Sequence, residues 1–491
     1  MLLPVMLVAQ VPDISLLGDG YMNLDIGQYD AGHSILPTEN AIYLTGTTTD
    51  DQGNVQLVIL ARQPNGSPMP TFGTNGQLVI DQPGYTWVGT RMKAASGNSS
   101  ILAAARSGSS GQDIVLFRIN GAGVIDPAFG QGGSVIIDRG QFDLLYDVLV
   151  QSDGRIAVLT YAPGVGGAVI KVEANGAAVS GFGVNGTANL PLGVLALTLA
   201  PAPGDGMSIG GNQWTGSQND CWMALLNGAG SFNNTFSGDG QTTFDLDPHL
   251  FDQTSDIITS LAPHPAGGHL ALVNIYGDAI GYGLYRIARL NAQGQLIPSF
   301  GGGGAVEVLS PNFNNRLPTL MLEPDGRSVL SVGTNTALVL EKRDSNGQLI
   351  NSWGNNGIAT ISVVGRTQYS MSEAVQDPQG RIIAIGSAYV ASDYIIAVDR
   401  VTNDLQTAIE PLDNGTLGLV AYPVPCQTQL TLRAEEPLRR VDVMDMGGRL
   451  VQSSQPGTTQ AHLDLSEAEA GVYLVHAYGE HTFATRMVIK Q

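Results

Sequence analysis

Cysteine is almost missing from this chain of 491 residues, which contains only Cys221 and Cys426. Two cysteines cannot build a disulfide framework, and this widely separated pair does not have zinc-ligand spacing. Low cysteine usage neither proves nor excludes an extracellular location.

Basic side chains are also scarce, since 23 Lys and Arg stand against 43 Asp and Glu and give a formal net charge of −20. Affinity for nucleic acid comes mostly from cations that neutralise phosphates. The composition therefore argues against DNA, RNA and anionic membrane surfaces as partners. Solubility is the ordinary reason for so acidic a surface, and calcium-dependent surface association is the alternative.

Long apolar runs are missing as well. The longest candidate, residues 190–204, is interrupted by proline and glycine and is too short to span a bilayer, so no transmembrane segment is predicted. Residues 2–9 resemble the end of a secretory signal without its usual positive start. We expect residues 1–12 to be part of a signal peptide, and a first strand is the alternative.

Glycine, in contrast, is abundant, with 63 residues, and it recurs in a pattern. An aromatic residue followed by a glycine-rich turn, such as residues 72–76 or 129–133, appears again and again along the chain. A degenerate copy, without the aromatic, comes first. The glycines that close these turns are Gly20, Gly76, Gly133, Gly186, Gly240, Gly304 and Gly357. They mark seven copies of one unit.

Each unit contains four short apolar runs rich in β-branched residues and separated by Gly, Asn, Asp and Pro, which is typical of strands. No window in this region has helical periodicity. Because a propeller blade consists of four antiparallel strands, the sequence predicts an all-β fold with a seven-bladed β-propeller over residues 13–405.

The repeat resembles a known family in three of its features. These are the Phe-Gly-x-x-Gly turn, a Pro-Asp-Gly-Arg turn at residues 324–327, and Ala-Arg-Leu-Asn at residues 288–291. Together they resemble the delta-60 repeat, over about 390 residues. The resemblance implies a bacterial surface or secreted propeller.

Strand counting predicts how the ring closes. The repeats begin with a strand of the fourth type at residues 21–25 and end with a strand of the third type at residues 394–399. We expect these two strands to pair, because the pairing removes two open sheet edges. One blade would then be built from both ends of the repeat region.

The sequence pattern changes after the repeats. Residues 406–420 carry no base and are interpreted as a linker, and residues 421–491 contain short alternating runs that predict a small β-sandwich. The segment resembles the type A C-terminal sorting domain of the type IX secretion system. The residues that carry the resemblance include Tyr422, Pro423, Pro425, Gly447, Gly448, Arg449, Gly471, Tyr473 and Lys490. It implies the type IX machinery as partner and a secreted or cell-surface location in a Gram-negative bacterium.

The sequence contains few motifs that indicate catalysis or metal binding. Residues 206–210 match Gly-x-Ser-x-Gly, but Ser208 falls on a repeat strand rather than on the turn before a helix that a nucleophile elbow needs. His264 and His269 flank a Gly-Gly turn and are expected in an exposed loop rather than as a metal pair. Asp245, Asp247 and Asp252 lack the pattern of an EF-hand loop, although adventitious calcium is the alternative there. No catalytic residue, metal site or cofactor is predicted.

One basic position recurs in six units and is interpreted as a fastener between blades. Its residues are Arg62, Arg118, Lys171, Arg289, Lys342 and Arg400. The recurring phenylalanine is interpreted as core filling between blades.

The residue that opens each first strand is expected near the central channel if that strand is innermost. These candidate ligand-binding residues are His33, Thr90, Asp147, Thr259, Thr319 and Ser372, with Ala196 by looser alignment. The ring is polar and small, and ordinary solvated channel lining is the alternative to a ligand site.

Two functions fit these observations. The first is a non-enzymatic, monomeric secreted or surface propeller that binds a protein or a glycan. The second is a polysaccharide hydrolase or lyase with its site at the channel mouth. Glycosidic bond hydrolysis needs two carboxylates facing one cleft, and the predicted ring offers only Asp147, which favours the first function.

Overall fold

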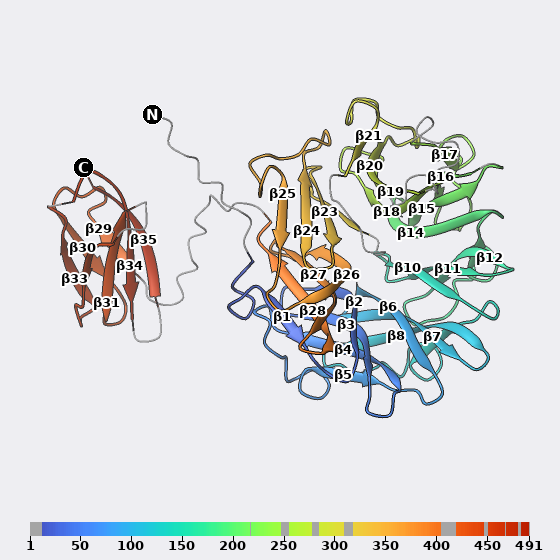
Figure 1. Ribbon diagram of the computed structural model, residues 1–491, viewed down its shortest axis with the longest axis horizontal. Coiled ribbons are helices and arrows are strands. Elements are labelled where there is room, and N and C mark those ends of the chain that lie inside the picture. The colour runs from blue at the N-terminus through green and yellow to red at the C-terminus, as the bar shows by residue number, and fades with distance from the viewer. Residues whose placement is uncertain are drawn as a thin grey trace. The chain divides into compact units, whose positions relative to one another are not determined.

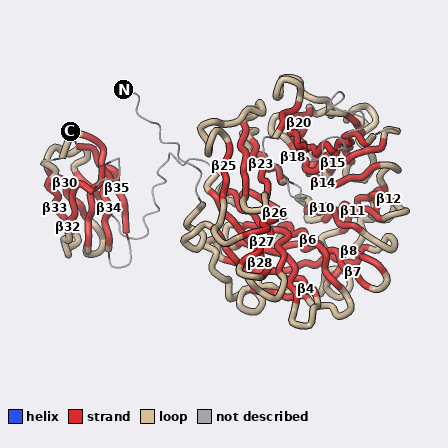
Figure 2. The backbone as a smooth tube through the Cα atoms, viewed as in Figure 1, coloured by secondary structure: helices blue, strands red, loops and turns tan. Residues whose placement is uncertain are grey.

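The computed structural model describes residues 12–216, 218–246, 255–276, 284–308, 318–403, 419–445, 450–466, 468–479 and 483–490. Within these ranges every regular element is a strand (Figure 2). No helix long and apolar enough to cross a membrane occurs among them. The expected signal peptide and linker fall almost wholly outside these ranges. The chain divides into two compact units, residues 1–404 and 405–491, and each is described by itself.

The first unit contains seven four-stranded antiparallel sheets within the described ranges. In the first four sheets the strands follow chain order. The first sheet consists of β2 (Asp30–Pro37), β3 (Ile42–Thr49), β4 (Val55–Arg62) and β5 (Gln77–Ile80), and the second of β6 (Thr86–Ala95), β7 (Ser99–Gly108), β8 (Gly111–Asn120) and β9 (Ser134–Ile137). The third sheet consists of β10 (Leu144–Val150), β11 (Ile156–Ala162), β12 (Gly166–Val172) and β13 (Thr187–Asn189), and the fourth of β14 (Val194–Ala202), β15 (Gly206–Trp214), β16 (Asn219–Leu226) and β17 (Gln241–Phe244).

Two further sheets keep the same order. They are β18 (Ser255–Pro263), β19 (His269–Tyr276), β20 (Leu284–Leu290) and β21 (Ala305–Glu307), and then β22 (Thr319–Leu322), β23 (Ser328–Gly333), β24 (Leu338–Arg343) and β25 (Ile358–Ile361). The remaining sheet has the order β1-β28-β27-β26. Its strands are β1 (Tyr21–Leu24), β26 (Thr367–Gln376), β27 (Ile382–Val390) and β28 (Asp393–Val401).

The sheets follow one another around a common centre (Figure 1). The first strand of each sheet contacts the first strand of the next, from β2 through β6, β10, β14, β18 and β22 to β26, and β26 contacts β2 again. The first strands therefore form a closed inner ring, while the fourth strand of each sheet lies at its other edge. This arrangement is propeller-like.

The predicted closure of the ring is confirmed. Strand β1 pairs antiparallel with β28, with Tyr21 opposite Asp399 and Leu24 opposite Ile396. The last sheet thus takes its outer strand from the N-terminal side of the repeats. The pairing gives the backbone groups of β28 partners on both sides.

The glycine-rich turn of the repeat joins neighbouring sheets. Phe72 is fully buried and belongs to one core cluster with Trp87 and Met92 of the next sheet, which confirms the predicted packing role of the recurring aromatic residue. The glycine after it, Gly73, donates its N–H to Ala122 O of the next sheet at 2.8 Å. The sequence repeat therefore encodes the contact from sheet to sheet.

The recurring basic position is only partly a fastener between sheets. Arg118 donates to Ala174 O of the next sheet at 3.1 Å, and Arg400 donates to Pro64 O at 2.5 Å. Arg289 differs, because it donates to Gly267 O and to other carbonyls of its own sheet. The predicted role is wrong for Arg289, whose guanidinium instead satisfies a turn of its own sheet. The described hydrogen bonds of Arg62 also stay within its own sheet, and Lys171 Nζ has no hydrogen-bond partner among the described residues.

The second unit contains two sheets within its described residues. One consists of β29 (Val420–Tyr422), β30 (Gln429–Arg433) and β33 (Gln460–Asp464), and the other of β31 (Arg440–Asp445), β32 (Leu450–Ser454), β34 (Gly471–Tyr478) and β35 (Phe483–Lys490). Leu430 of the first sheet and Val443 and Val475 of the second belong to one buried core. The alternating side chains of the short strands therefore pack the two sheets together.

The residues that carried the sorting resemblance lie at several places in this unit. Tyr422 is half exposed at the end of β29, and Pro423 and Pro425 follow it. Tyr473 is buried and donates its hydroxyl to Glu469 O at 2.6 Å. At the far edge, Gly471 pairs with Lys490. Gly447, Gly448 and Arg449 lie outside the described residues.

Candidate functional site

A β-bulge interrupts most of the inner strands. Strand β26 has an irregularity between Thr367 and Ser370, and in six of the seven first strands, β26 included, a single residue is skipped in the pairing with the second strand. These residues are His33, Val88, Tyr146, Leu197, Thr259 and Ser372. A bulge inserts one residue and changes which side chains face each way beyond it. Residues chosen at equal sequence spacing in each repeat therefore do not all lie on the same face of their inner strands.

The predicted ring residues do lie on the inner strands, but not at one structural position. His33, Thr259 and Ser372 are bulged residues, whereas Thr90 and Asp147 lie beyond their bulges. Ala196 lies just before its bulge, and Thr319 is in β22, which pairs regularly with β23. The ring as a ligand site stays a prediction.

Two of the predicted ring residues make hydrogen bonds within the protein. Thr90 is buried, and its hydroxyl lies 2.6 Å from that of Thr45 in the preceding sheet. Thr259 is half-buried and donates to Leu272 O at 3.3 Å. Neither hydroxyl needs a ligand to satisfy it.

Two carboxylates of the inner ring connect neighbouring sheets. Asp147 accepts the N–H of Leu199 in the next sheet at 2.8 Å. Glu373, which the sequence analysis missed, accepts the N–H of Ile35 at 2.9 Å. Burial raises the pKa of Glu373, but nearby Lys93, whose Nζ lies 3.6 Å away, and Arg91 bring it below its ordinary value. Both carboxylates are thus engaged in holding sheets together.

Two adjoining cavities lie beside β10. The smaller, of about 260 Å³, reaches toward Thr90, and the larger, of about 510 Å³, opens between the third and fourth sheets. Leu144 and Tyr146 line both. The larger cavity is lined by Leu144, Tyr146, Tyr161, Gly164, Val165, Gly166, Pro191, Leu192, Gly193, Val194, Leu195, Asn212, Asn219 and Tyr276.

The larger cavity, called here the tyrosine cavity, combines aromatic rings with amides. The pKa of Tyr146 is raised by burial and by the nearby Tyr161, so the Tyr146 phenol keeps its proton at neutral pH and can donate a hydrogen bond. Asn212 is buried in the wall, and Tyr276 is 40% exposed. A cavity of this size with apolar walls and a few polar groups is typical of a small-molecule site.

Sequence reasoning missed Tyr146 by one residue. It selected Asp147, but the bulge at Tyr146 turns Asp147 toward the next sheet, and Tyr146 lines the cavity. Its aromatic neighbour Tyr161 comes from the adjacent strand, opposite Leu144. The only available signal was a tyrosine on an inner strand, since nothing in the local pattern predicts the bulge.

Ser208 and His269 form a buried pair. Ser208 lies on β15, as predicted, and its Oγ is 2.7 Å from His269 Nε2 on β19 of the next sheet. The prediction of an exposed loop is wrong for His269, which begins β19 and is buried. Burial and the charge of Arg289 lower the pKa of His269 to about 4. A fully buried Ser208 outside a strand–turn–helix elbow is a sheet-to-sheet hydrogen-bond partner rather than a nucleophile.

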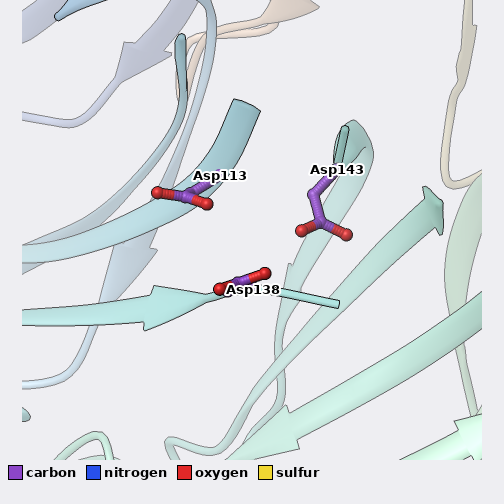
Figure 3. Close-up of side chains that lie close together, drawn as sticks. All are labelled: Asp113, Asp138 and Asp143. Atoms are coloured by element: carbon purple, nitrogen blue, oxygen red, sulfur yellow. The ribbon is translucent and has the colours of Figure 1, made fainter. Parts of the chain in front are cut away.

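One group of acids stands out among the described residues as a possible metal site. Asp113, Asp138 and Asp143 converge between the second and third sheets (Figure 3). An oxygen of each lies within 4.8 Å of the others. Asp247 and Asp252, which the sequence analysis considered, lie outside the described residues.

Comparison with known families identifies the end of the chain. Residues 420–491 match the family described as a secretion system C-terminal sorting domain. This domain directs export by the type IX secretion system, so the protein is delivered to the cell surface or the extracellular space. No curated protein matches the chain in sequence.

Several solved structures resemble the chain in fold. A protein of unknown function from Dyadobacter fermentans is 13% identical, with 66% of this chain and 97% of that chain covered and a TM-score of 0.43. The polysaccharide lyase Uly1 is 11% identical, with 76% and 90% covered and a TM-score of 0.45. The β-propeller domain of the Trilobed protease from Pyrococcus furiosus is 9% identical, with 75% and 96% covered and a TM-score of 0.41. Similarity at this level says nothing of what the chain binds.

Proposed function

We propose that the first unit is a seven-bladed β-propeller of delta-60-like repeats over residues 13–405. In this proposal, residues 1–12 belong to a signal peptide, residues 406–420 form a linker, and residues 421–491 form a sandwich-like sorting domain. The seven described four-stranded sheets and the closed ring of first strands support the blade number. The common core of the two C-terminal sheets supports the sandwich.

The propeller is an exported, non-enzymatic module that binds a glycan in the tyrosine cavity. The observation that carries this proposal is the cavity of about 510 Å³ lined by Tyr146, Tyr161, Tyr276, Asn212 and Asn219. Aromatic rings offer flat faces to the apolar face of a sugar, while phenols and amides exchange hydrogen bonds with its hydroxyls. A concave site of this size suits one or two sugar rings better than the broad face of a protein.

Catalysis by a pair of carboxylates has little support. Asp147 and Glu373 each accept a backbone N–H of a neighbouring sheet, so both carboxylates already have a role in holding sheets together. Tyr146, with its raised pKa, is a poor general base at neutral pH. A polysaccharide hydrolase or lyase is therefore the second candidate.

A glycan array probed with the protein lacking residues 421–491 separates the two functions. In parallel, the same protein is incubated with polysaccharides, and new reducing ends and unsaturated products are measured. The proposal predicts retention of one class of glycan without turnover. Turnover without stable retention would contradict it and favour the hydrolase or lyase.

A further inference from the structure

Backbone pairing forces three carboxylates of the second and third sheets together. Ile114 on β8 pairs with Ile137 on β9, so Asp113 and Asp138 occupy the next cross-strand position. The loop that leads to β10 brings in the third acid, because Asp143 donates its N–H to Gln112 O, beside Asp113, at 2.7 Å. Like charges in such positions destabilise a sheet unless a cation compensates them.

Asp143 is the most informative member of the group. It is fully buried, and its Oδ2 accepts the N–H of Arg139 at 2.8 Å. Its Oδ1 is buried and has no hydrogen-bond donor among the described residues. The carboxylate faces the space between Asp113 and Asp138 (Figure 3). A buried carboxylate oxygen without a donor is costly unless a cation binds it.

The first sheet offers a direct comparison. Asp30 is also fully buried, and its Oδ2 accepts the N–H of Ile26, four residues earlier, at 2.6 Å. There, the hydroxyl of Thr48 donates to Oδ1 at 2.5 Å, so both oxygens have partners. The same loop connection thus exists in both sheets, but only Asp143 has an unsatisfied oxygen that faces other carboxylates.

The protein cations near the group do not balance its charge. Arg106 contacts Asp113 at 3.0 Å. Arg139 directs its guanidinium elsewhere, to Gly166 O at 2.9 Å and Asn189 Oδ1 at 3.2 Å. Three carboxylates with one contacting guanidinium leave a net charge suited to a divalent ion.

We propose that Asp113, Asp138 and Asp143 bind a calcium ion between the second and third sheets. All the ligand atoms are carboxylate oxygens, which suit a hard cation, and exposed Asp138 leaves room for water to complete the six to eight ligands that calcium takes. Extracellular calcium modules bind at about 10⁻⁴–10⁻³ M, a range that suits an exported protein. This proposal does not depend on glycan binding.

Calorimetric titration of CaCl₂ into the chelator-treated full chain tests the site. We expect one site with a dissociation constant of about 10⁻⁴–10⁻³ M and a higher melting temperature in calcium. Asp138→Asn, at an exposed position, should weaken binding at least tenfold and leave the apo melting temperature nearly unchanged. Asp143→Asn should abolish binding. The control Asp30→Asn should lower the melting temperature in both conditions and leave calcium affinity unchanged.

Three results would overturn the proposal. The first is no calcium binding by the wild-type chain at millimolar concentration. The second is unchanged affinity in both Asp138→Asn and Asp143→Asn, or its loss only in Asp252→Asn, which would assign the ion to another segment. The third is equal affinity for MgCl₂, which would contradict a flexible, oxygen-rich calcium site.

Discussion

Gly130, in the glycine-rich turn before β9, shows what the repeat demands of a single residue. It has φ = +61°, and a Cβ there would lie 2.1 Å from Ser134 O. Gly132 of the same turn has φ = +64° but open space around it. Substitutions at these two glycines therefore distinguish the cost of backbone strain alone from the cost of strain combined with a steric clash.

We expect Gly132→Ala to lower the free energy of unfolding by about 1 kcal/mol, the cost of a left-handed conformation. Gly130→Ala should lower it by about 3 kcal/mol, because the new methyl group also forces β9 to move. Urea denaturation of the two variants measures the difference. Equal effects would contradict the assigned role of Gly130.

His269 gives a prediction for pH. Its pKa is about 4 in the folded protein and about 6.5 when unfolded, so the unfolded state binds a proton that the native state does not. This contribution to stability is fully present above pH 6.5 and is lost as pH falls toward 4. It amounts to about 3 kcal/mol.

The variant His269→Gln, which keeps a donor near Ser208, removes this titration. Chemical denaturation from pH 7 to pH 4 should therefore show a shallower loss of stability in the variant than in the wild type. Parallel curves for the two proteins would contradict the buried neutral state of His269.

The limits of sequence reasoning are clearest at the residue scale. The packing role of Phe72 was predictable because a repeated aromatic residue must serve every sheet. The position of Tyr146 in the cavity was not predictable, because this tyrosine is not part of the repeat pattern and lines the cavity as a result of a bulge. Glu373 was missed for the same reason, because the bulge at Ser372 displaces the alignment by one residue.

At the scale of elements, the pairing of β1 with β28 depends on one buried arginine. Arg366 contacts Asp399 of β28 at 2.7 Å and donates to Asn23 Oδ1 and Met22 O of β1 at 2.7 and 2.9 Å. Both Arg366 and Asp399 are almost fully buried. The pairing itself was predictable by counting strands, whereas the contacts of Arg366 were not, although Arg139 makes a related contact with Gly166 O and Asn189 Oδ1 in the third sheet.

Arg366→Ala should destabilise the first unit by about 3–5 kcal/mol, because it leaves Asp399 charged and buried. The control is Arg155→Ala, which breaks an ion pair of 3.0 Å with Glu173 that is more than a third exposed. That change should lower the melting temperature far less than Arg366→Ala does, because solvent screens an exposed ion pair. Thermal unfolding distinguishes them. A similar loss of stability in both variants would contradict the role of Arg366 in holding β1 against β28.

For the whole molecule, the sorting domain and the propeller have separate cores, so each unit should fold without the other. Deletion of residues 421–491 should leave a folded first unit that is retained within the cell envelope. Fractionation of the producing bacterium, with circular dichroism of the recovered protein, measures both effects. Surface delivery of the truncated chain would contradict the role of the domain.

At this scale the sequence predicts architecture far better than function. Repeats of about 55 residues reveal the number and order of strands, because each unit repeats the same turns. The tyrosine cavity depends instead on what differs between units, such as Tyr161 on β11 and Tyr276 on β19. A single sequence does not show which of these differences meet in space.

The central claim is that the tyrosine cavity binds a glycan, and the affinity of a Tyr276 variant tests it most directly. Calorimetry with the best ligand from the glycan array would compare the wild type, Tyr276→Ala and Tyr29→Ala, which changes a half-exposed tyrosine outside the cavity. Loss of one aromatic face should weaken binding about tenfold in Tyr276→Ala and leave Tyr29→Ala unchanged. Equal affinity in all three proteins would contradict the account.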